Sequence, residues 1–385
     1  MGASWKIFGV PVGGLPFGDT RTITSAVDYL RANVDPYSDA ALDHFGQHFN
    51  YPPAWLLLER TGITQEGSSN AIGIFLIASA FSCFLILFRP STTYSRMATF
   101  FAILSPPVLL ALERGNCDVI LFSIAVWGFY FTARLSDIPR KILHAALVTL
   151  LTVLKIYPIA AAIGTIRRRR DFATSAAIVV FALAVLLGTS FHELLAVFRY
   201  TPTPVGLSFG NLPGLIEMSE RGWFGLPTDL TKLRIIADCA TVIVALAAIV
   251  CTVRANRRAQ RPFPTFGPRE PIDNVALACL AVFCLAFCFG SNWAYRLIFL
   301  LGVLPPLIRA NDERGSAGAR IAIGAIIALL WLSRVSARAA LIFEPLTWVV
   351  FAGAAGWIGV TLWERSFGRG GASSPAVLEQ QRQPG

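Results

Sequence analysis

Charged residues are scarce in this sequence: they make up 15% of its 385 residues, against 55% for apolar residues. The mean hydropathy of +0.59 excludes an ordinary soluble globular domain, because most side chains then need lipid or neighbouring transmembrane helices as their surroundings. The sequence is therefore that of an integral membrane protein.

The sequence also lacks the motifs of several enzyme classes. It contains no P-loop, GxGxxG, nucleophile elbow or HExxH motif, so a soluble nucleotide-sugar site and serine chemistry have no support. The seven cysteines form no CxxC pair and indicate neither a disulfide framework nor a zinc site. We predict no cofactor and no metal. A metal shell of His44 and His48 with Asp39 or Asp43 is the minor alternative.

The formal net charge of +10 comes from 33 Lys and Arg residues against 23 Asp and Glu residues. The basic residues stand in short runs between apolar stretches, as they do when they fix the orientation of transmembrane helices. We therefore expect membrane lipid as a partner and no nucleic acid.

Nine apolar stretches are long enough, or nearly long enough, to cross a bilayer, which takes about 20 residues. The predicted fold is all-α: a polytopic transmembrane helical bundle over 69–363, preceded by a helical extracytoplasmic segment over 1–68 and followed by a disordered cytoplasmic tail over 364–385. The spans are expected at about 69–88, 97–113, 117–134, 172–190, 234–253, 274–290, 296–309, 320–334 and 346–363.

The basic runs fall in connections that the span count places on one side, which the positive-inside rule makes cytoplasmic. Arg334 and Arg338 are exceptions in an expected outer loop. We predict a multi-pass protein of the cell (inner) membrane whose active site is extracytoplasmic. The outer side then holds 1–68, the turn 113–118, the loop from about 191 to 233, and 290–296.

The start of the sequence has no recognisable signal peptide. With the predicted orientation the amino terminus lies outside, although no span precedes it. We expect an initial helix to be missing because the true start lies upstream.

The apolar segment 142–166 is flanked by basic residues at both ends. A single crossing would place one basic run outside, so we predict a re-entrant hairpin that enters from the cytoplasm and turns near Lys155 and Pro158. Its first arm rises roughly 20 Å, which lifts Lys155 about two-thirds of the way through a hydrocarbon core of about 30 Å. A single crossing is the alternative.

Asp19 is the leading catalytic candidate. A carboxylate at the mouth of the membrane is partly desolvated and suits a general base that acts on an acceptor hydroxyl. The alternative interpretation is a helix N-cap, since threonines and an amphipathic run follow it.

Three cations are candidates for holding a phosphate. Arg114 stands in a tight outer turn between two spans, with Asn116 and Asp118 beside it, and an ammonium such as Lys155 deep in hydrocarbon needs an anionic partner or a watery cavity. Arg296 repeats the outer-turn pattern, although it also suits an interfacial anchor. Further residues expected to line the substrate cavity are Asp35, Tyr37, Tyr51, Asn116, Asp118, Asn292 and Tyr295.

Six short motifs follow one another along the sequence: Phe17-Gly18-Asp19, Asp35-Pro36-Tyr37, Asn50-Tyr51-Pro52-Pro53, Arg114-Gly115-Asn116-Cys117-Asp118, Leu154-Lys155-Ile156-Tyr157-Pro158 and Asn292-Trp293-Ala294-Tyr295-Arg296. By this ordered set the sequence resembles glycosyltransferase family 87, a GT-C-fold group formerly known as a domain of unknown function. The resemblance extends from about residue 15 to 310 and implies transfer of a mannose-like hexose or a pentose from a polyprenyl-phosphate donor to a lipid or glycan acceptor on the outer face. It also implies that Asp19 is the general base. The sequence departs from the family in lacking the first span and in carrying Thr20-Arg21-Thr22.

We therefore predict a membrane glycosyltransferase (a hexosyltransferase). The alternative is a polytopic transporter or flippase of envelope precursors, which would also need many spans and a few buried charges. A non-catalytic partner in envelope synthesis is a further alternative.

Overall fold

The computed structural model describes residues 10, 14–38, 46, 48–201, 208–258, 266–267, 270–289, 292–333 and 337–367, with side chains in these ranges apart from 223 and 337–341. Residues 1–9, His44 with its neighbours Asp39 and Asp43, Arg334, the Arg338 side chain and the tail from 368 to 385 lie outside the described residues.

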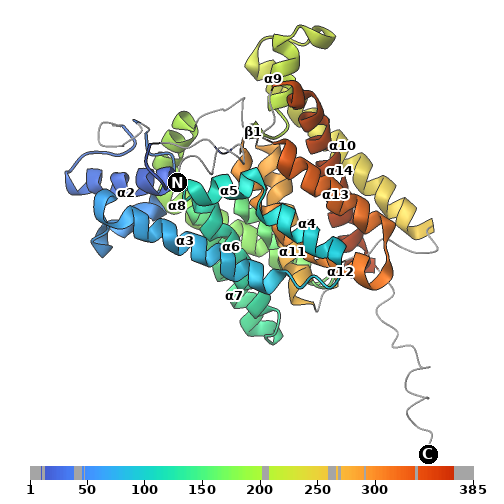
Figure 1. Ribbon diagram of the computed structural model, residues 1–385. Helices are drawn as coiled ribbons and strands as arrows, with labels where there is room; N and C mark the ends of the chain where they lie inside the picture. The colour runs from blue at the N-terminus through green and yellow to red at the C-terminus, as the bar shows by residue number, and fades with distance from the viewer. Residues whose placement is uncertain are drawn as a thin grey trace, which may run out of the picture.

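The described chain is mostly helical (Figure 1). Its 3₁₀ helices are named η. Its first half comprises α2 (Gly18–Arg31), η1 (Pro53–Thr61), α3 (Gln65–Leu87), α4 (Thr93–Ile103), α5 (Pro106–Glu113), α6 (Cys117–Thr132), α7 (Asp137–Leu154), η2 (Tyr157–Thr165) and α8 (Asp171–Tyr200). Its second half comprises β1 (Ser208–Phe209), α9 (Pro213–Glu220), η3 (Trp223–Gly225), α10 (Leu230–Arg258), α11 (Pro271–Cys288), β2 (Asn292–Trp293), η4 (Ala294–Gly302), α12 (Leu304–Arg314), α13 (Ala317–Leu332) and α14 (Ala337–Phe367).

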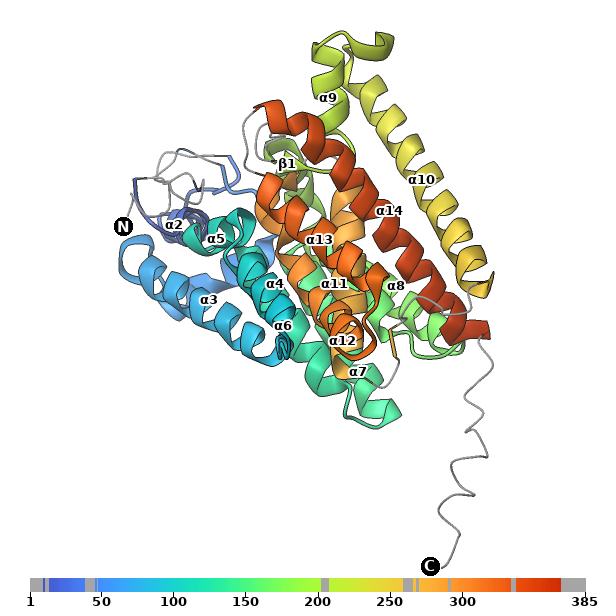
Figure 2. The same cartoon turned by 45° about the vertical axis from the view of Figure 1, so that its right-hand side comes forward.

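Five described helices are long and apolar enough to cross a membrane: α3, α8, α10, α11 and the part of α14 over Ile342–Phe367. The helices α4 and α5 form a sixth candidate as a pair bent by 43°. The long helices lean in a common direction, with α9 beyond one end of the bundle and α12 and α7 toward the other (Figure 2). The predicted polytopic helical bundle is confirmed.

The remaining three of the nine expected spans fall on shorter or broken helices. The helices α6 and α13 have 16 residues each, and the expected span 296–309 is divided between η4 and α12. Proline accounts for such breaks, since Pro106 starts α5 and Pro305 lies in the first turn of α12. Non-helical backbone is tolerated at membrane depth when protein surrounds it, and every residue of η4 except Arg296 is buried.

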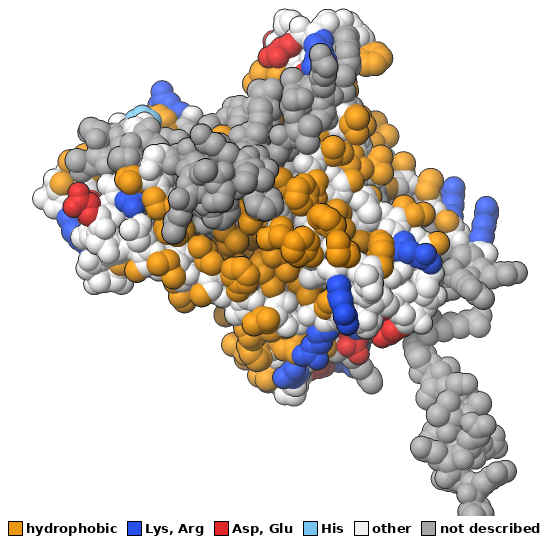
Figure 3. Space-filling view, in the orientation of Figure 1, with side chains coloured by type: hydrophobic (Ala, Val, Ile, Leu, Met, Phe, Trp, Pro, Cys, Tyr) orange, Lys and Arg blue, Asp and Glu red, His pale blue; other side chains and the backbone are white. Residues whose placement is uncertain are grey.

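The outer surface of the bundle is apolar. Figure 3 shows hydrophobic side chains across the middle of the molecule, with most of the Lys and Arg side chains gathered at its lower and right-hand edge. The helix α10 illustrates this, because only 11% of its most apolar window is buried, and Ile243 and Leu246 are more than half exposed. Such a surface is expected where lipid replaces water as the solvent.

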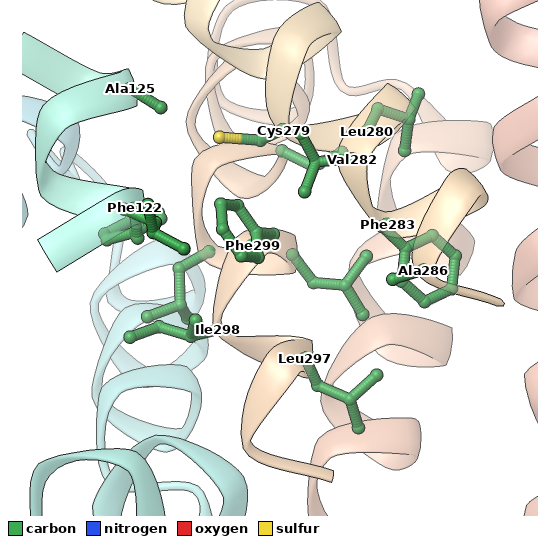
Figure 4. Close-up of a cluster of buried hydrophobic side chains, with 14 of the residues drawn as sticks. Phe122, Ala125, Cys279, Leu280, Val282, Phe283, Ala286, Leu297, Ile298 and Phe299 are labelled. Atoms are coloured by element: carbon green, nitrogen blue, oxygen red, sulfur yellow. The ribbon is translucent and has the colours of Figure 1, made fainter. Parts of the chain in front are cut away.

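The core is centred on α11, of which 72% of the most apolar window is buried. Its residues Cys279 and Phe283 lie among side chains of α6 and η4 (Figure 4). The ring of Phe299 in η4 packs edge-on against that of Phe122 in α6, with centroids 6.0 Å apart. This packing fixes η4, and with it Arg296, against the start of α6.

The segment from α7 to η2 turns back on itself. The helix α7 ends at Leu154, Lys155 has an extended backbone conformation, and η2 packs against α7. The two ends meet, because Lys141 pairs with Asp171 at 3.5 Å and Arg170 pairs with Asp137 at 2.8 Å. This geometry agrees with a hairpin, whose depth in the bilayer stays a prediction.

Candidate active site

The first turn of α2 is docked on the turn between α5 and α6. The backbone N–H groups of Phe17 and Asp19 donate to the carbonyls of Glu113 and Arg114, each at 2.9 Å. The hydroxyl of Thr20 donates to the carbonyl of Gly115 at 2.6 Å. Three hydrogen bonds therefore place Asp19 against the Arg114 turn.

Gly115 is required in this turn for two reasons. Its φ of +56° lies in the left-handed region, which favours glycine. A Cβ atom at this position would also collide with the Thr20 hydroxyl and crowd the Phe17 side chain. The Arg-Gly-Asn sequence thus allows two chain segments to approach closely.

Both carboxylate oxygens of Asp19 are held. Arg114 reaches Oδ1 with Nη2 at 2.6 Å and with Nε at 2.7 Å, and Asn116 donates from Nδ2 to Oδ2. Asp19 itself is only 6% exposed. The N-cap interpretation of Asp19 is wrong, because the N-cap of α2 is Phe17 and Asp19 lies inside the helix.

A second cluster lies at the start of α6, whose N-cap is Asn116. Asp118 is fully buried, and its Oδ1 atom accepts hydrogen bonds from Lys155 Nζ at 2.7 Å and from the hydroxyl of Tyr157. The guanidinium Nε of Arg296 lies 3.7 Å from the other oxygen, Oδ2. Because Asn116 also contacts Asp19, the two clusters adjoin.

Two buried polar atoms in this second cluster lack hydrogen-bond partners: Oδ2 of Asp118 and Nε of Arg296. Lys155 and Arg296 together carry one more charge than Asp118 neutralises. These two atoms lie 3.7 Å apart, within ion-pair distance but too far for a hydrogen bond. Buried polar atoms almost always have a hydrogen bond, so this loose contact calls for a functional explanation. The arrangement suits an anion that would contact both cations.

Aromatic rings surround the cations. Lys155 Nζ lies 5.6 Å from the ring centroids of both Tyr51 and Tyr157, and Arg296 lies 4.9 Å from that of Tyr157. Burial raises the pKa of Tyr51 well above its usual value, and the nearby Asp19 carboxylate raises it further. The Tyr51 hydroxyl therefore stays neutral at physiological pH and is not a general base.

The sequence-predicted residues fall into three groups. Asp19, Arg114 and Asn116 form one cluster, and Asp118, Lys155 and Arg296 form the adjoining one, with Tyr51 and Tyr295 close to both, since Tyr295 is buried and interacts electrostatically with Asp19 and Arg296. Asp35 and Tyr37 belong to neither cluster; both line two adjoining pockets near the end of α2. Asn292 is buried, and its amide donates to the carbonyl of Ala286 at 2.5 Å.

The sequence interpretation gave no role to Tyr157, Cys117 or Glu193. The signal that could have indicated Tyr157 is its position two residues after Lys155 and directly before a proline in the predicted turn. Cys117 Sγ lies 3.2 Å from Lys155 Nζ. Glu193 stands in α8 without any motif, and only the fold brings it to Asp35 and Tyr37.

Within the ranges that the structure describes, no group of three or more His, Cys, Asp or Glu side chains is arranged to hold a metal ion. His48 stacks on Tyr200 with ring centroids 4.4 Å apart. Its expected partner His44 lies outside those ranges.

The model of the family described as Glycosyltransferase family 87 matches residues 49–268 of the chain. This segment contains Arg114, Asp118 and Lys155, whereas Asp19 and Arg296 flank it. No curated protein and no solved structure matches the chain.

Proposed function

Because the chain belongs to glycosyltransferase family 87, we propose that it moves a mannose-like sugar from a polyprenyl-phosphate donor to an acceptor on the extracytoplasmic face. The chain is a multi-pass membrane glycosyltransferase, so it uses a sugar donor and an acceptor. Family membership sets aside the transporter and flippase alternative. The donor, the hexose, the acceptor side and the catalytic base are the proposed parts.

The observation that carries the donor proposal is the buried, incompletely paired set of Asp118, Lys155 and Arg296. A polyprenyl-phosphate sugar is a phosphodiester with one negative charge, which matches the single positive charge left over in this set. When the sugar departs, the phosphate gains negative charge, and cations held at low dielectric stabilise that change most effectively. Arg114 is the third donor-side cation, but it also holds Asp19.

Asp19 is proposed as the general base. The acceptor oxygen attacks the anomeric carbon, the bond from that carbon to the phosphate oxygen breaks, and its electron pair remains on the phosphate. The acceptor hydroxyl proton passes to the Asp19 carboxylate. Arg114 and Asn116 fix the orientation of this carboxylate. Arg114 occupies Oδ1 with two contacts, whereas Oδ2 accepts from Asn116 and retains a lone pair for the acceptor proton.

The hairpin geometry supports an extracytoplasmic site. Its two ends carry the ion pairs between 137–141 and 170–171, next to the basic residues that we assign to the cytoplasm. Lys155 lies at the opposite end of α7, about 27 Å along an 18-residue helix. A site near Lys155 is then close to the outer side.

The donor class is tested with the purified chain in proteoliposomes. We expect transfer of labelled mannose from polyprenyl-phosphate mannose to octyl mannoside, and none from GDP-mannose. An Arg296→Gln variant should raise the KM for the polyprenyl donor, while Arg60→Gln, an exposed control on η1, should not. Transfer from GDP-mannose alone, or an unchanged KM in Arg296→Gln, would contradict the proposed donor site.

A further inference from the structure

A pocket of about 660 Å³ lies between the α2–η1 connection and the outer end of α8. Its volume lies within the roughly 300–1,000 Å³ of typical small-molecule sites. An adjoining pocket of about 250 Å³ shares Asp35, Tyr37 and Ala196 with it.

The lining of the larger pocket is suited to an uncharged polyol. Asp35 and Glu193 offer carboxylates, and Glu193 has no hydrogen bond or ion pair with any described residue. The buried ring of Tyr37 provides an aromatic wall of the kind on which a sugar can stack. The described lining of the larger pocket holds these two carboxylates and His192 but no Lys or Arg, so it disfavours a phosphate, in contrast to the Lys155 and Arg296 cluster.

The depth of the pocket follows from the length of α8. This helix begins at Asp171, in the cytoplasmic ion-pair cluster, and its backbone is interrupted at Ser190 by a non-helical residue. Twenty residues at 1.5 Å each cover about 30 Å, the thickness of the hydrocarbon core. The last turns of α8, which line the pocket, therefore stand at the depth of the outer headgroups.

An apolar surface borders the pocket on the same helix. Phe191 and Phe198 are 54% and 61% exposed, and Leu195, which is 57% exposed, also lines the smaller pocket. A molecule with its polar part in the pocket can thus keep acyl chains against α8 without leaving the bilayer. A free glycan would gain nothing from this surface.

The pocket is also next to the proposed transfer site. The hydroxyl of Tyr37 donates to the carbonyl of Tyr51 at 3.0 Å, and the Tyr51 ring faces Lys155. One residue thus separates the pocket wall from the cation cluster. We propose that this pocket binds the uncharged sugar headgroup of a lipid-anchored acceptor, whose acyl chains lie along the outer end of α8. The role of this ligand as an acceptor rests on the proposed glycosyl transfer at Asp19.

The test uses binding without donor, so that it does not depend on transfer. The probe is octyl mannoside with a photoreactive diazirine in its alkyl chain, added to the full chain in proteoliposomes. Mass spectrometry should find the label on the outer end of α8, with saturable protection by unlabelled octyl mannoside. Methyl mannoside, which has the same sugar and no tail, should protect at least about tenfold less well, because it has no alkyl chain to bury against α8.

Two variants test the sugar contacts. Glu193→Gln and Asp35→Asn should each raise the half-protecting concentration of octyl mannoside by about tenfold, as expected when a charged hydrogen-bond acceptor is lost. Asn at 35 can still accept from the Tyr37 N–H, which Asp35 does at 3.0 Å, so the turn is retained. Glu59→Gln is the matched control, since Glu59 is exposed on η1 and lines neither pocket.

If the half-protecting concentration of octyl mannoside is unchanged in both Glu193→Gln and Asp35→Asn, the headgroup site is overturned, and the labelling reports only a contact with lipid. Equal protection by methyl mannoside would overturn the lipid anchor and indicate a soluble glycan. A chain that still transfers mannose but shows no saturable labelling of α8 would overturn the pocket while the proposed function stands. Saturable labelling in a chain without transfer activity would retain the pocket and remove the proposed reaction.

Discussion

The carboxylate of Asp19 and the guanidinium of Arg114 lie 2.6 Å apart, although 95 residues separate them in the sequence. Arg114 makes two contacts to the same oxygen, and the backbone of its own turn accepts the Asp19 N–H. Arg114 therefore acts on the position of Asp19 as well as on the local charge. This pair is the point from which the activity of the site is best tested.

Asp19→Asn should abolish transfer and leave the protein folded. Loss of a general base typically lowers the rate by about 10²–10⁴-fold. The measurement is transfer from polyprenyl-phosphate mannose in proteoliposomes, together with size-exclusion chromatography and a melting curve. Asp28→Asn is the control on the same helix, since Asp28 binds the backbone of Gln65 and the Arg31 side chain, outside both clusters. Full activity of Asp19→Asn would remove the assigned base.

Asp118→Asn should destabilise the protein more than Lys155→Met. Without Asp118, Lys155 and Arg296 face each other with no counter-charge, and removal of one partner from a buried ion pair typically costs about 3–5 kcal/mol. Without Lys155, Asp118 still has Arg296 and Tyr157. The double variant should therefore be no less stable than Asp118→Asn, as measured by thermal unfolding in detergent. Additive losses in the double variant would show that the residues are not coupled.

Gly115→Ala should cost more stability than Gly62→Ala. Both glycines have positive φ, of +56° and +77°, which costs a non-glycine residue about 1–2 kcal/mol. A Cβ at Gly62 has open space around it, whereas one at Gly115 collides with Thr20. The additional loss of stability in Gly115→Ala, relative to Gly62→Ala, measures how closely α2 packs on the Arg114 turn. It should be accompanied by reduced transfer, whereas Gly62→Ala should transfer normally. Equal effects of the two variants would contradict the close approach.

The candidate site could be predicted in part because its residues stand at the ends of apolar stretches. Arg114 and Lys155 are polar residues where an expected span ends or the hairpin turns, and each is costly there without a role. Asp19 lies ahead of the first expected span and was a candidate as a carboxylate at the mouth of the membrane. The pairing of Asp19 with Arg114 was not predictable, because it depends on which helix ends meet in space. The contacts of Asn292 were not predictable either, since its amide binds the carbonyl of Ala286 near the end of α11 and its strand pairs with β1. Its place in the substrate cavity stays a prediction.

The long helices were predictable from hydropathy, but the broken ones were not. A hydropathy window sees 296–309 as one apolar stretch, whereas the backbone divides it into η4 and α12. The helix break has a local cause, because prolines remove backbone hydrogen-bond donors. Non-helical backbone is tolerated here only because α11 and α6 bury it, and that burial depends on the whole fold. The pocket at Asp35 had no sequence signal on its α8 side.

The stability should fall at low pH partly through Asp312. Burial raises the pKa of this group, but hydrogen bonds from Ser91, Ser95 and Thr92 outweigh burial and hold the pKa below its usual value. A depressed folded pKa stabilises the fold above the unfolded pKa of about 3.9, and this stabilisation is lost as the pH falls toward the folded value. Asp312→Asn should therefore lower the melting temperature at pH 6 and make less difference at pH 3. Glu313→Gln, which is exposed, should have no such pH-dependent effect; a difference in Asp312→Asn that is independent of pH would contradict the assignment.

The side of the membrane on which Asp19 lies can be determined with two cysteine variants, in a background where the exposed Cys239 and Cys251 are replaced by serine. Glu59→Cys reports on the segment around α2, because the Arg31 side chain at the end of α2 donates to the Glu59 carbonyl at 2.9 Å. An impermeant maleimide should label Glu59→Cys in intact cells and Glu313→Cys only after permeabilisation, because the basic end of α12 is assigned to the cytoplasm. The reverse pattern would place Asp19 in the cytoplasm, where an extracytoplasmic acceptor could not reach it.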